Sequence, residues 1–186
     1  MTQSPVPWSM IRRCRGAVGV MLFGILTSGT MPAGPLDNEA AVKAGCLFNF
    51  VRYSVWPPDV LPPGSPVGIC AFGPSAVARS LEITFKGRKI ENRPVIIRLL
   101  PDLTDTAGCH VLFLSGAPSR QMKTLLKSPR SASLLIVGDD DTFSAMGTLL
   151  DFSIEKGRVV FIANGETISR SRVRLSPSLL GLARFR

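Results

Sequence analysis

Apolar side chains at helical spacing mark the start of the folded part of the chain. Between residues 38 and 55 they recur roughly every three to four positions in two rows, which predicts a helix buried on two sides. Asp37 or Asn38 is expected to cap its first turn, because short polar side chains accept hydrogen bonds from free backbone N–H groups. The Trp56-Pro57-Pro58 segment is expected to end the helix, because proline has no N–H and restricts the residue before it.

Six short apolar runs after residue 66 have the composition of β-strands. They cover residues 67–72, 94–99, 110–115, 134–137, 148–155 and 158–163. Long polar segments separate the first four runs, and two of these segments, 75–85 and 119–126, have helical spacing. This alternation of strands and helices favours crossover connections and parallel pairing.

The last two strands are expected to pair differently. A tight turn at Gly157 separates two alternating runs, which predicts an antiparallel hairpin. Short helices are expected at 165–169 and 177–185, the second with Ser176 as its cap and Pro177 in its first turn. The predicted fold class is α/β: a mixed, mostly parallel sheet of about six strands with an antiparallel edge hairpin, flanked by helices in a Rossmann-like three-layer arrangement. Many unrelated functions share such a fold.

The first 34 residues have the pattern of a signal peptide. Arg12, Arg13 and Arg15 precede an uncharged run over residues 16–26, which is too short for a transmembrane helix. We therefore expect residues 1–34 to be removed on export and residues 35–186 to fold as one domain. An uncleaved N-terminal anchor is the alternative, because no sharp Ala-x-Ala cleavage site is present.

Charge narrows the choice of partners. The formal net charge is +9, and the three arginines before the apolar run leave residues 35–186 with 19 basic and 13 acidic side chains, or +6. A basic domain attracts nucleic acid, anionic lipid or an acidic protein surface. Export removes nucleic acid from this set, so acidic partners outside the cytoplasm remain.

Three cysteines lie beyond the predicted signal peptide: Cys46, Cys70 and Cys109. In an oxidising compartment, one disulfide and one spare thiol are the simplest interpretation. Cys70 and Cys109 belong to two different predicted strands, and a bridge between them would close a loop of about 40 residues. Two unbridged buried thiols are the alternative. With a single histidine and no Cys-x-x-Cys pair, a structural zinc site is not expected.

One ligand site is suggested by the segment after the strand at 67–72. Gly73 and Ser75 precede a predicted helix, whose free N–H groups are suited to a phosphate or a carboxylate. Helix capping by Ser75 is the competing interpretation, because the Gly-x-Gly-x-x-Gly fingerprint is absent and Pro74 lacks a donor.

Metal binding and catalysis have weaker support. Adjacent side chains of Asp139, Asp140 and Asp141 fan apart, so capping of a following helix is favoured over a metal site. His110 lies in an apolar run without a recognised nucleophile motif and is interpreted as a packed or partly exposed histidine. The chain is therefore predicted to be a binding protein without a cofactor rather than an enzyme.

Several ordered segments resemble the YfiR family. Over residues 38–183 they are Val42-Lys43-Ala44, Leu47-Phe48-Asn49-Phe50, Val55-Trp56-Pro57, Ile69-Cys70-Ala71-Phe72-Gly73, Gly87-Arg88 with Arg93-Pro94-Val95, Cys109-His110-Val111-Leu112-Phe113-Leu114, Val159-Val160-Phe161-Ile162-Ala163-Asn164, and Arg174-Leu175-Ser176 with Leu179-Leu180. The chain departs from the family at Cys46, where tyrosine is usual, and at Met146-Gly147, where Gly-Gly is common. It also has no second cysteine pair near the predicted hairpin.

The resemblance implies a periplasmic protein that binds and represses the sensor portion of an inner-membrane diguanylate cyclase. Repression would lower cyclic-di-GMP signalling and biofilm formation. The resemblance also implies a homodimer, an outer-membrane lipoprotein as a further partner, and a disulfide at the positions of Cys70 and Cys109. The alternative is a periplasmic small-ligand-binding protein that feeds a sensor or a transporter.

The family's partner-binding surface lies around the last strand and the following helix. By this resemblance, the candidate partner-binding residues are Phe161, Ile162, Ile168 and Arg172.

Overall fold

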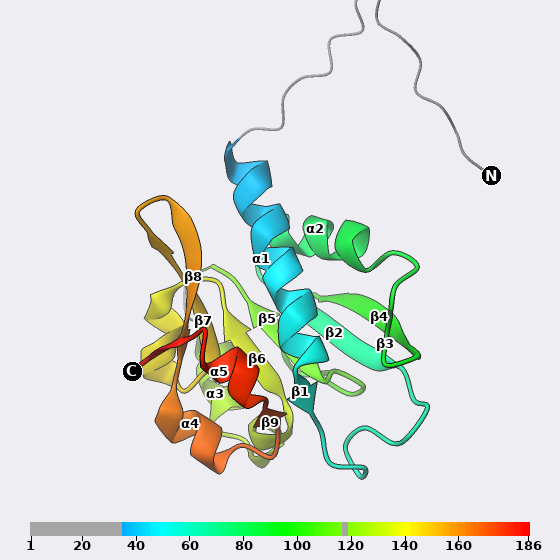
Figure 1. The fold of residues 1–186 in the computed structure, drawn as a ribbon. Helices are drawn as coiled ribbons and strands as arrows, with labels where there is room; N and C mark the ends of the chain where they lie inside the picture. The colour runs from blue at the N-terminus through cyan, green and yellow to red at the C-terminus, as the bar shows by residue number, and fades with distance from the viewer. Residues whose placement is uncertain (1–34, 117–118) are drawn as a thin grey trace, which may run out of the picture. The chain divides into compact units, whose positions relative to one another are not determined.

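A mixed sheet of eight strands lies at the centre of residues 35–116 and 119–186, which are the residues that the computed structural model describes (Figure 1). Its strand order is β10-β8-β7-β6-β5-β2-β4-β3. The six longer strands are β2 (Val67–Phe72), β4 (Arg93–Leu100), β5 (Val111–Leu114), β6 (Leu135–Gly138), β7 (Leu150–Glu155) and β8 (Arg158–Ala163). Strands β4, β2, β5, β6 and β7 pair in parallel, and β8 pairs antiparallel with β7. These six strands confirm the predicted runs.

Helices cover the two faces of the sheet. The crossover through α2 (Ala76–Phe85) leads from β2 to β4, whereas the crossover through α3 (Arg120–Leu126) leads from β5 to β6 in the opposite direction. Right-handed crossovers in opposite directions place their helices on opposite faces. The N-terminal helix α1 (Pro35–Arg52) packs on α2 and crosses the front of the sheet in Figure 1. This arrangement confirms the three-layer α/β fold. No helix within the described residues is long and apolar enough to span a membrane.

The middle strands are buried on both faces. All residues of β5 and β6 are buried, and all of them are aliphatic or aromatic except Gly138, which has no side chain. A continuous apolar run is typical of parallel strands covered by helices on both sides. Two 3-10 helices, η1 (Pro129–Ser133) and η2 (Asp141–Met146), flank β6 in the chain.

The C-terminal end of α1 differs from the sequence-based expectation. The helix ends at Arg52, and the next residues form β1 (Ser54–Val55), which pairs with β9 (Arg174–Leu175). Val55 is extended because it pairs with Arg174 of β9, and the restriction before Pro57 acts on the following residue, Trp56. Pairing with β9, which lies far away in the chain, ends the helix before the predicted position.

The C-terminal segment also differs. The helix predicted over 177–185 ends at Leu180, where α5 (Pro177–Leu180) is followed by Gly181. The chain then forms β10 (Arg184–Phe185), which pairs in parallel with β8, while β3 (Lys89–Ile90) pairs with the start of β4. The hairpin of β7 and β8 is therefore next to the sheet edge rather than at it. The other short helix, α4 (Gly165–Arg170), confirms the prediction and is capped by Asn164.

A disulfide joins Cys70 in β2 to Cys109, just before β5. The Cα atoms of the two residues are 5.7 Å apart, a distance that a disulfide spans readily. Cys46 is a free thiol, half-buried on α1. The predicted pairing is confirmed. The predicted signal peptide, residues 1–34, lies outside the described residues.

Removal of the disulfide is expected to destabilise the fold. The bridge closes a loop across 39 residues, so the loop-entropy model gives a loss of about 4 kcal/mol for Cys70→Ala/Cys109→Ala. Urea unfolding of the oxidised protein measures this loss, with Cys46→Ala as the control that keeps the bridge. A double variant as stable as the control would contradict the prediction.

Asp151 in β7 is a buried carboxylate. Ser144 Oγ donates to its Oδ2 at 2.5 Å, and Thr148 Oγ1 donates at 2.7 Å to Oδ1. Within the described residues, no lysine, arginine or histidine forms a salt bridge with it. Burial therefore raises its pKa to about 6, against the opposing effect of the two hydroxyl donors. Gly138 leaves room for this carboxylate, because a Cβ there would lie 2.3 Å from Oδ1.

The titration of Asp151 is expected to make stability depend on pH. Its folded pKa of about 6 exceeds the ordinary aspartate value of 3.8, so the stability that its protonated form contributes is present below pH 4 and is lost as pH rises through 6. The stability of Asp151→Asn relative to wild type should therefore increase by about 2 kcal/mol between pH 4 and pH 7. Urea unfolding at several pH values measures this difference. An unchanged difference across the range would contradict a raised pKa.

Candidate functional site

The carboxyl ends of β2 and β5 form the topological switch point of the sheet. The chain runs outward from β2 to β4 on one side and from β5 to β6 on the other, so the strand order reverses between β2 and β5. Open α/β sheets commonly bind ligands at such a switch point. Gly73 and Ser75, the predicted ligand-binding residues, lie directly after β2 at this edge.

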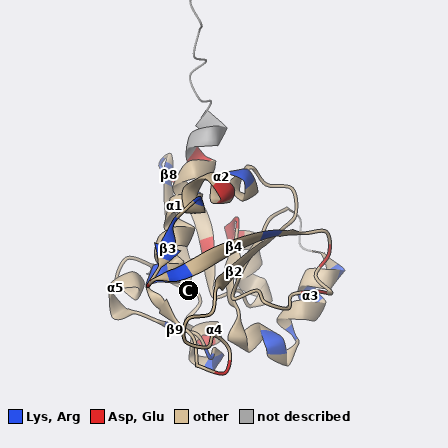
Figure 2. Cartoon of the chain, turned by 90° about the vertical axis from the view of Figure 1, so that its right-hand side faces the viewer, with Lys and Arg blue, Asp and Glu red and all other residues tan. Residues whose placement is uncertain are grey.

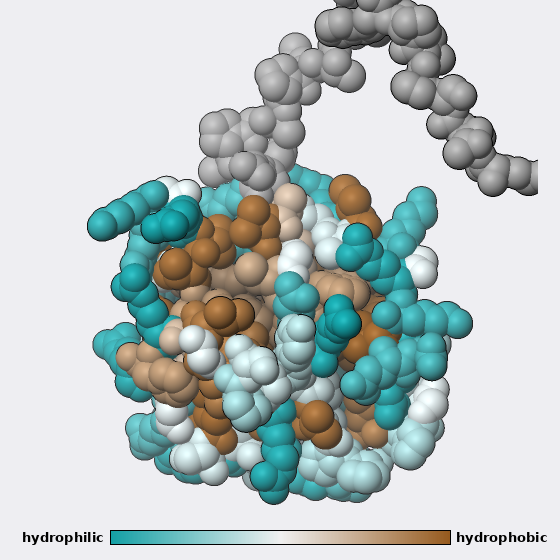
Figure 3. Space-filling view, in the orientation of Figure 1, coloured by the Kyte–Doolittle hydropathy of each residue, from teal (hydrophilic) through white to brown (hydrophobic). Residues whose placement is uncertain are grey.

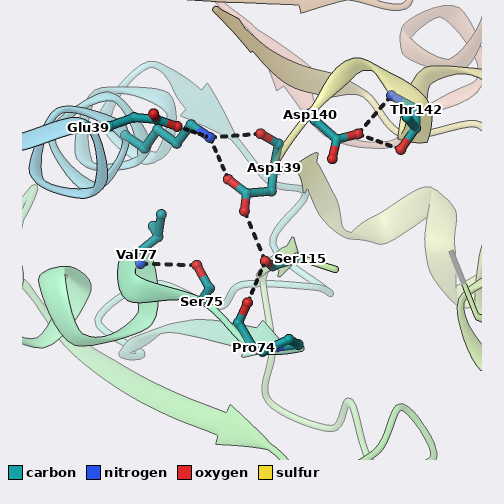
Figure 4. Close-up of polar contacts among 9 residues, drawn as sticks. Glu39, Pro74, Ser75, Val77, Ser115, Asp139, Asp140 and Thr142 are labelled. Carbon is teal, nitrogen blue, oxygen red and sulfur yellow. Dashed lines mark hydrogen bonds and ion pairs between the residues drawn. The ribbon is translucent and has the colours of Figure 1, made fainter. Parts of the chain in front are cut away.

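Both residues have structural roles at the switch point. Ser75 Oγ accepts a hydrogen bond from the N–H of Val77 at 3.0 Å and so caps α2 (Figure 4). Gly73 has a φ of +97°, and a Cβ there would lie 2.0 Å from the carbonyl oxygen of Ser115. The segments after β2 and β5 are thus in direct contact. The capping interpretation of Ser75 is confirmed, whereas ligand binding at these residues stays a prediction.

A buried ammonium group lies beside this edge of the sheet. Lys43 of α1 is 6% exposed, and its Nζ lies 2.8 Å from Glu39 Oε1 and 2.7 Å from Asp139 Oδ1. Asp139 follows β6, and its Oδ2 accepts from Ser115 Oγ at 2.9 Å. The same hydroxyl lies 2.9 Å from the carbonyl oxygen of Pro74, as Figure 4 shows. One chain of polar contacts therefore joins α1 to the ends of β6, β5 and β2.

The electrostatics of Lys43 keep it charged. Burial lowers its pKa, but the hydrogen bonds and charges of Asp139 and Glu39 outweigh burial and hold the pKa above its usual value. Asp140 has a different partner, because its side chain accepts from the N–H of Thr142 at 2.9 Å and caps η2. The predicted capping role for this aspartate run is confirmed at Asp140. Sequence reasoning did not predict the contact between Lys43 and Asp139.

His110 is packed into the fold. It is 8% exposed; its Nδ1 accepts from the N–H of Gly68 at 2.9 Å, and its Nε2 lies 3.2 Å from the carbonyl oxygen of Val60. Burial lowers its pKa, and the positive charges of Arg130 and Arg93 act in the same direction. Both ring nitrogens thus have backbone partners in a neutral imidazole. This geometry agrees with the interpretation of His110 as a packed histidine.

The predicted partner-binding residues Phe161 and Ile162 lie on opposite faces of the sheet. Side chains alternate along β8, and the Phe161 ring packs against Phe50 of α1 with 4.8 Å between centroids. Ile162 is paired in register with Asp151, which lies on the other face. Adjacent positions in a strand cannot contribute to one continuous patch, so only Phe161 belongs to the α1 side.

The α1 side carries an apolar surface that a structure, but not the sequence, reveals. Val42 and Cys46 share one stripe of α1, and Tyr53 continues it directly after the helix. This stripe is next to Phe50 and hence next to β8. Val42 is 43% exposed, Tyr53 42% and Ile154 of β7 48%. Figure 3 shows apolar side chains gathered between α1 and the β7–β8 hairpin. This α1–hairpin surface comprises Val42, Cys46, Tyr53, Ile154, Val159 and Phe161.

Ile168 and Arg172 line a separate groove of about 550 Å³ together with Pro57. Arg172 Nη2 donates to both carboxylate oxygens of Asp59, at 2.6 and 2.9 Å. These hydrogen bonds lower the pKa of Asp59. The structure therefore brings Ile168 and Arg172 together, in a groove whose lining includes neither Phe161 nor Ile162.

The family model described as YfiR/HmsC-like matches residues 40–184, most of the chain. The chain belongs to the YfiR/HmsC-like family. Membership confirms the resemblance seen in the sequence and supports a periplasmic regulator of diguanylate cyclase signalling. Proteins of the YfiR/HmsC-like family are regulatory rather than catalytic.

Two solved structures are similar to this YfiR/HmsC-like chain at low sequence identity. A conserved domain protein from Vibrio cholerae has 9% identity and a TM-score of 0.48, with 76% of this chain and 59% of that chain covered. The ABC domain in complex with L-Trp from Streptococcus pneumoniae has 11% identity and a TM-score of 0.49, with 81% and 61% covered. The chain thus spans about three fifths of the length of each of these proteins.

In this YfiR/HmsC-like protein, loss of the Lys43 ammonium is expected to destabilise the fold. Lys43→Met leaves the carboxylate of Asp139, itself 22% exposed, without its cation, and should cost about 2 to 3 kcal/mol. Lys43→Met/Asp139→Asn should recover part of this loss, because the uncompensated charge is removed. Urea unfolding measures both, with Lys123→Met at an exposed position of α3 as the control. Equal stability of Lys43→Met and the control would refute the prediction.

Proposed function

We propose that this YfiR/HmsC-like protein binds and represses the periplasmic sensor portion of an inner-membrane diguanylate cyclase. Repression lowers cyclic-di-GMP signalling and biofilm formation. Family membership supports the regulatory role. The α1–hairpin surface is the main support for the position of the binding site. Exposed apolar side chains that gather on one face are typical of protein–protein contacts.

The composition of this surface is suited to a protein partner. Phe161 is anchored from below by Phe50, so its ring is held in place and loses little conformational freedom on binding. Ile154 lies on the β7–β8 hairpin and Val42 on α1, and each residue is close to half exposed. Such a preorganised aromatic group with aliphatic neighbours is typical of binding hot spots.

The charge of the domain favours an acidic partner surface. Residues 35–186 have a formal charge of +6, from 19 basic and 13 acidic side chains. Complementary charge speeds association and orients the two proteins.

We further propose that Ile168 and Arg172 form a second contact region and that Ile162 contributes from the other face of the sheet. We also propose that the protein acts as a homodimer, with an outer-membrane lipoprotein as a second partner.

Substitutions on the α1–hairpin surface are expected to weaken partner binding. Ile154→Asp and Val42→Asp each place a charge in an apolar contact and should reduce affinity at least tenfold. Isothermal titration calorimetry with the purified periplasmic sensor portion of a candidate inner-membrane diguanylate cyclase measures the change. Ile83→Asp is the matched control, because Ile83 is 78% exposed on α2, away from this surface.

The same variants also test function in cells. Ile154→Asp should raise cyclic-di-GMP relative to wild type, while Ile83→Asp should not, provided that circular dichroism shows both variants folded. Absence of binding by the wild-type protein, together with unchanged cyclic-di-GMP on deletion, would remove the proposed function. Binding that Ile154→Asp and Val42→Asp leave unchanged would move the contact to another face.

A further inference from the structure

A groove on the α3 face of the sheet is separate from every site described above. It has a volume of about 500 Å³ and lies between the loop of residues 101–108 and α3 with its following segment. Leu103 and Leu125 form its base, with 6% and 7% exposure. The crossover rule places α3 on the sheet face opposite α1 and α2, so this groove and the α1–hairpin surface are on different sides. The groove therefore has an apolar base of its own.

Polar groups surround this apolar base. Thr104 and Thr124 line the groove from its two walls, and both residues are exposed. Gln121 Oε1 lies 3.4 Å from the N–H of Leu103, so the amide links α3 to the loop. An apolar base with a few placed hydroxyl and amide groups is typical of small-molecule sites, whose volumes are about 300 to 1,000 Å³.

Arg130 is held rigidly at the rim of the groove. Its Nε donates to Thr106 Oγ1 at 2.8 Å, and its Nη2 donates to the carbonyl oxygen of Thr106 at 2.5 Å. Thr106 is buried, so these two hydrogen bonds fix the guanidinium plane against the loop. A guanidinium whose orientation is already fixed loses little freedom when it binds an anion.

The rim has unpaired positive charge. Arg120 at the start of α3 also lines the groove, and neither Arg120 nor Arg130 forms a salt bridge with a carboxylate of residues 35–116 or 119–186. Asp105, on the same loop, is paired instead with Arg98 at 3.1 Å. Figure 2 shows basic residues on α3 and on the segment beside it. Two arginines at one rim are thus available to an external anion.

The loop of residues 101–108, which forms one wall of the groove, is held in place by contacts with β4 and β2. Arg98 donates to the carbonyl oxygen of Ala107 and to Asp105, which ties both ends of the loop's last turn to β4. The loop then ends at Cys109, whose disulfide to Cys70 joins it to β2. The turn that contains Thr106 is therefore held on both sides by contacts within the protein.

We propose that this groove binds a small organic carboxylate with an apolar body, held by Arg130 and Arg120 through its carboxylate and by Leu103 and Leu125 through its body. The guanidinium fork matches the geometry of a carboxylate. Desolvated apolar area on the base supplies the remaining affinity. This site is independent of the proposed repression of a cyclase and of the switch point at Gly73 and Ser75.

Titration with 4-phenylbutyrate tests the site, with 4-phenylbutanamide as the neutral isostere. A millimolar dissociation constant is expected for a probe of about a dozen non-hydrogen atoms. The amide should bind at least about tenfold more weakly, because it lacks the charge that the arginines recognise. Two-dimensional NMR of the purified protein locates the probe through shifts of the Leu103, Thr106 and Leu125 amides.

Three variants separate the site from nonspecific binding. Arg130→Gln and Arg120→Gln should each weaken 4-phenylbutyrate about tenfold, and Thr124→Trp should abolish binding because the indole fills the groove. Arg79→Gln is the matched control, since Arg79 is exposed on α2 at the other face.

The titrations of the wild type and the variants either support or overturn the proposed carboxylate site. Binding that follows this order, with Arg79→Gln unchanged, supports the proposal. Absence of saturable binding up to about 10 mM, equal affinity for the amide, or full binding by both Arg120→Gln and Thr124→Trp overturns it. Because Arg120 and Thr124 are exposed, these two variants keep the test valid if Arg130→Gln loosens the loop. Cyclase binding is measured separately, so failure here leaves the proposed function standing.

Discussion

The buried Lys43 ammonium joins α1 to the end of β6 and so constrains where the N-terminal helix lies. A buried cation is stable only when carboxylates replace its water, and Asp139 and Glu39 do so within 3 Å. Asp139 in turn accepts from Ser115, so the same charge fixes the segments after β5 and β6. The position of α1 then places Phe50 under Phe161, and the α1–hairpin surface depends on this arrangement.

Structural contacts also occupy the residues at the switch point. In many open α/β sheets the carboxyl ends of the strands leave a crevice for a ligand. Here Gly73 is in contact with Ser115, and Ser75 is occupied as the cap of α2. Further features suited to binding lie on the α1–hairpin surface and in the arginine-rimmed groove beside α3. This distribution agrees with a family whose proteins are regulatory.

Local patterns predicted most of the fold because their physical causes act over a few residues. The buried runs of β5 and β6, the caps at Ser75 and Ser176, and the Gly157 turn each depend on near neighbours. The errors lie where a distant partner decides. Pairing with β9 ends α1 at Arg52, and pairing with β8 converts the end of the last predicted helix into β10.

The sequence alone determined the α/β class, the six longer strands and the family, because periodicity, composition and segment order carry this information. It favoured the pairing of Cys70 with Cys109 over two unbridged thiols, and the structure decided between them. Only the tertiary structure decided which candidate residues share a face. Alternation along β8 separates Phe161 from Ile162, although they are neighbours in the chain, while folding brings Lys43 to Asp139 across 96 positions. Side-chain direction and long-range contacts follow from packing of the whole domain, which no local window of sequence contains.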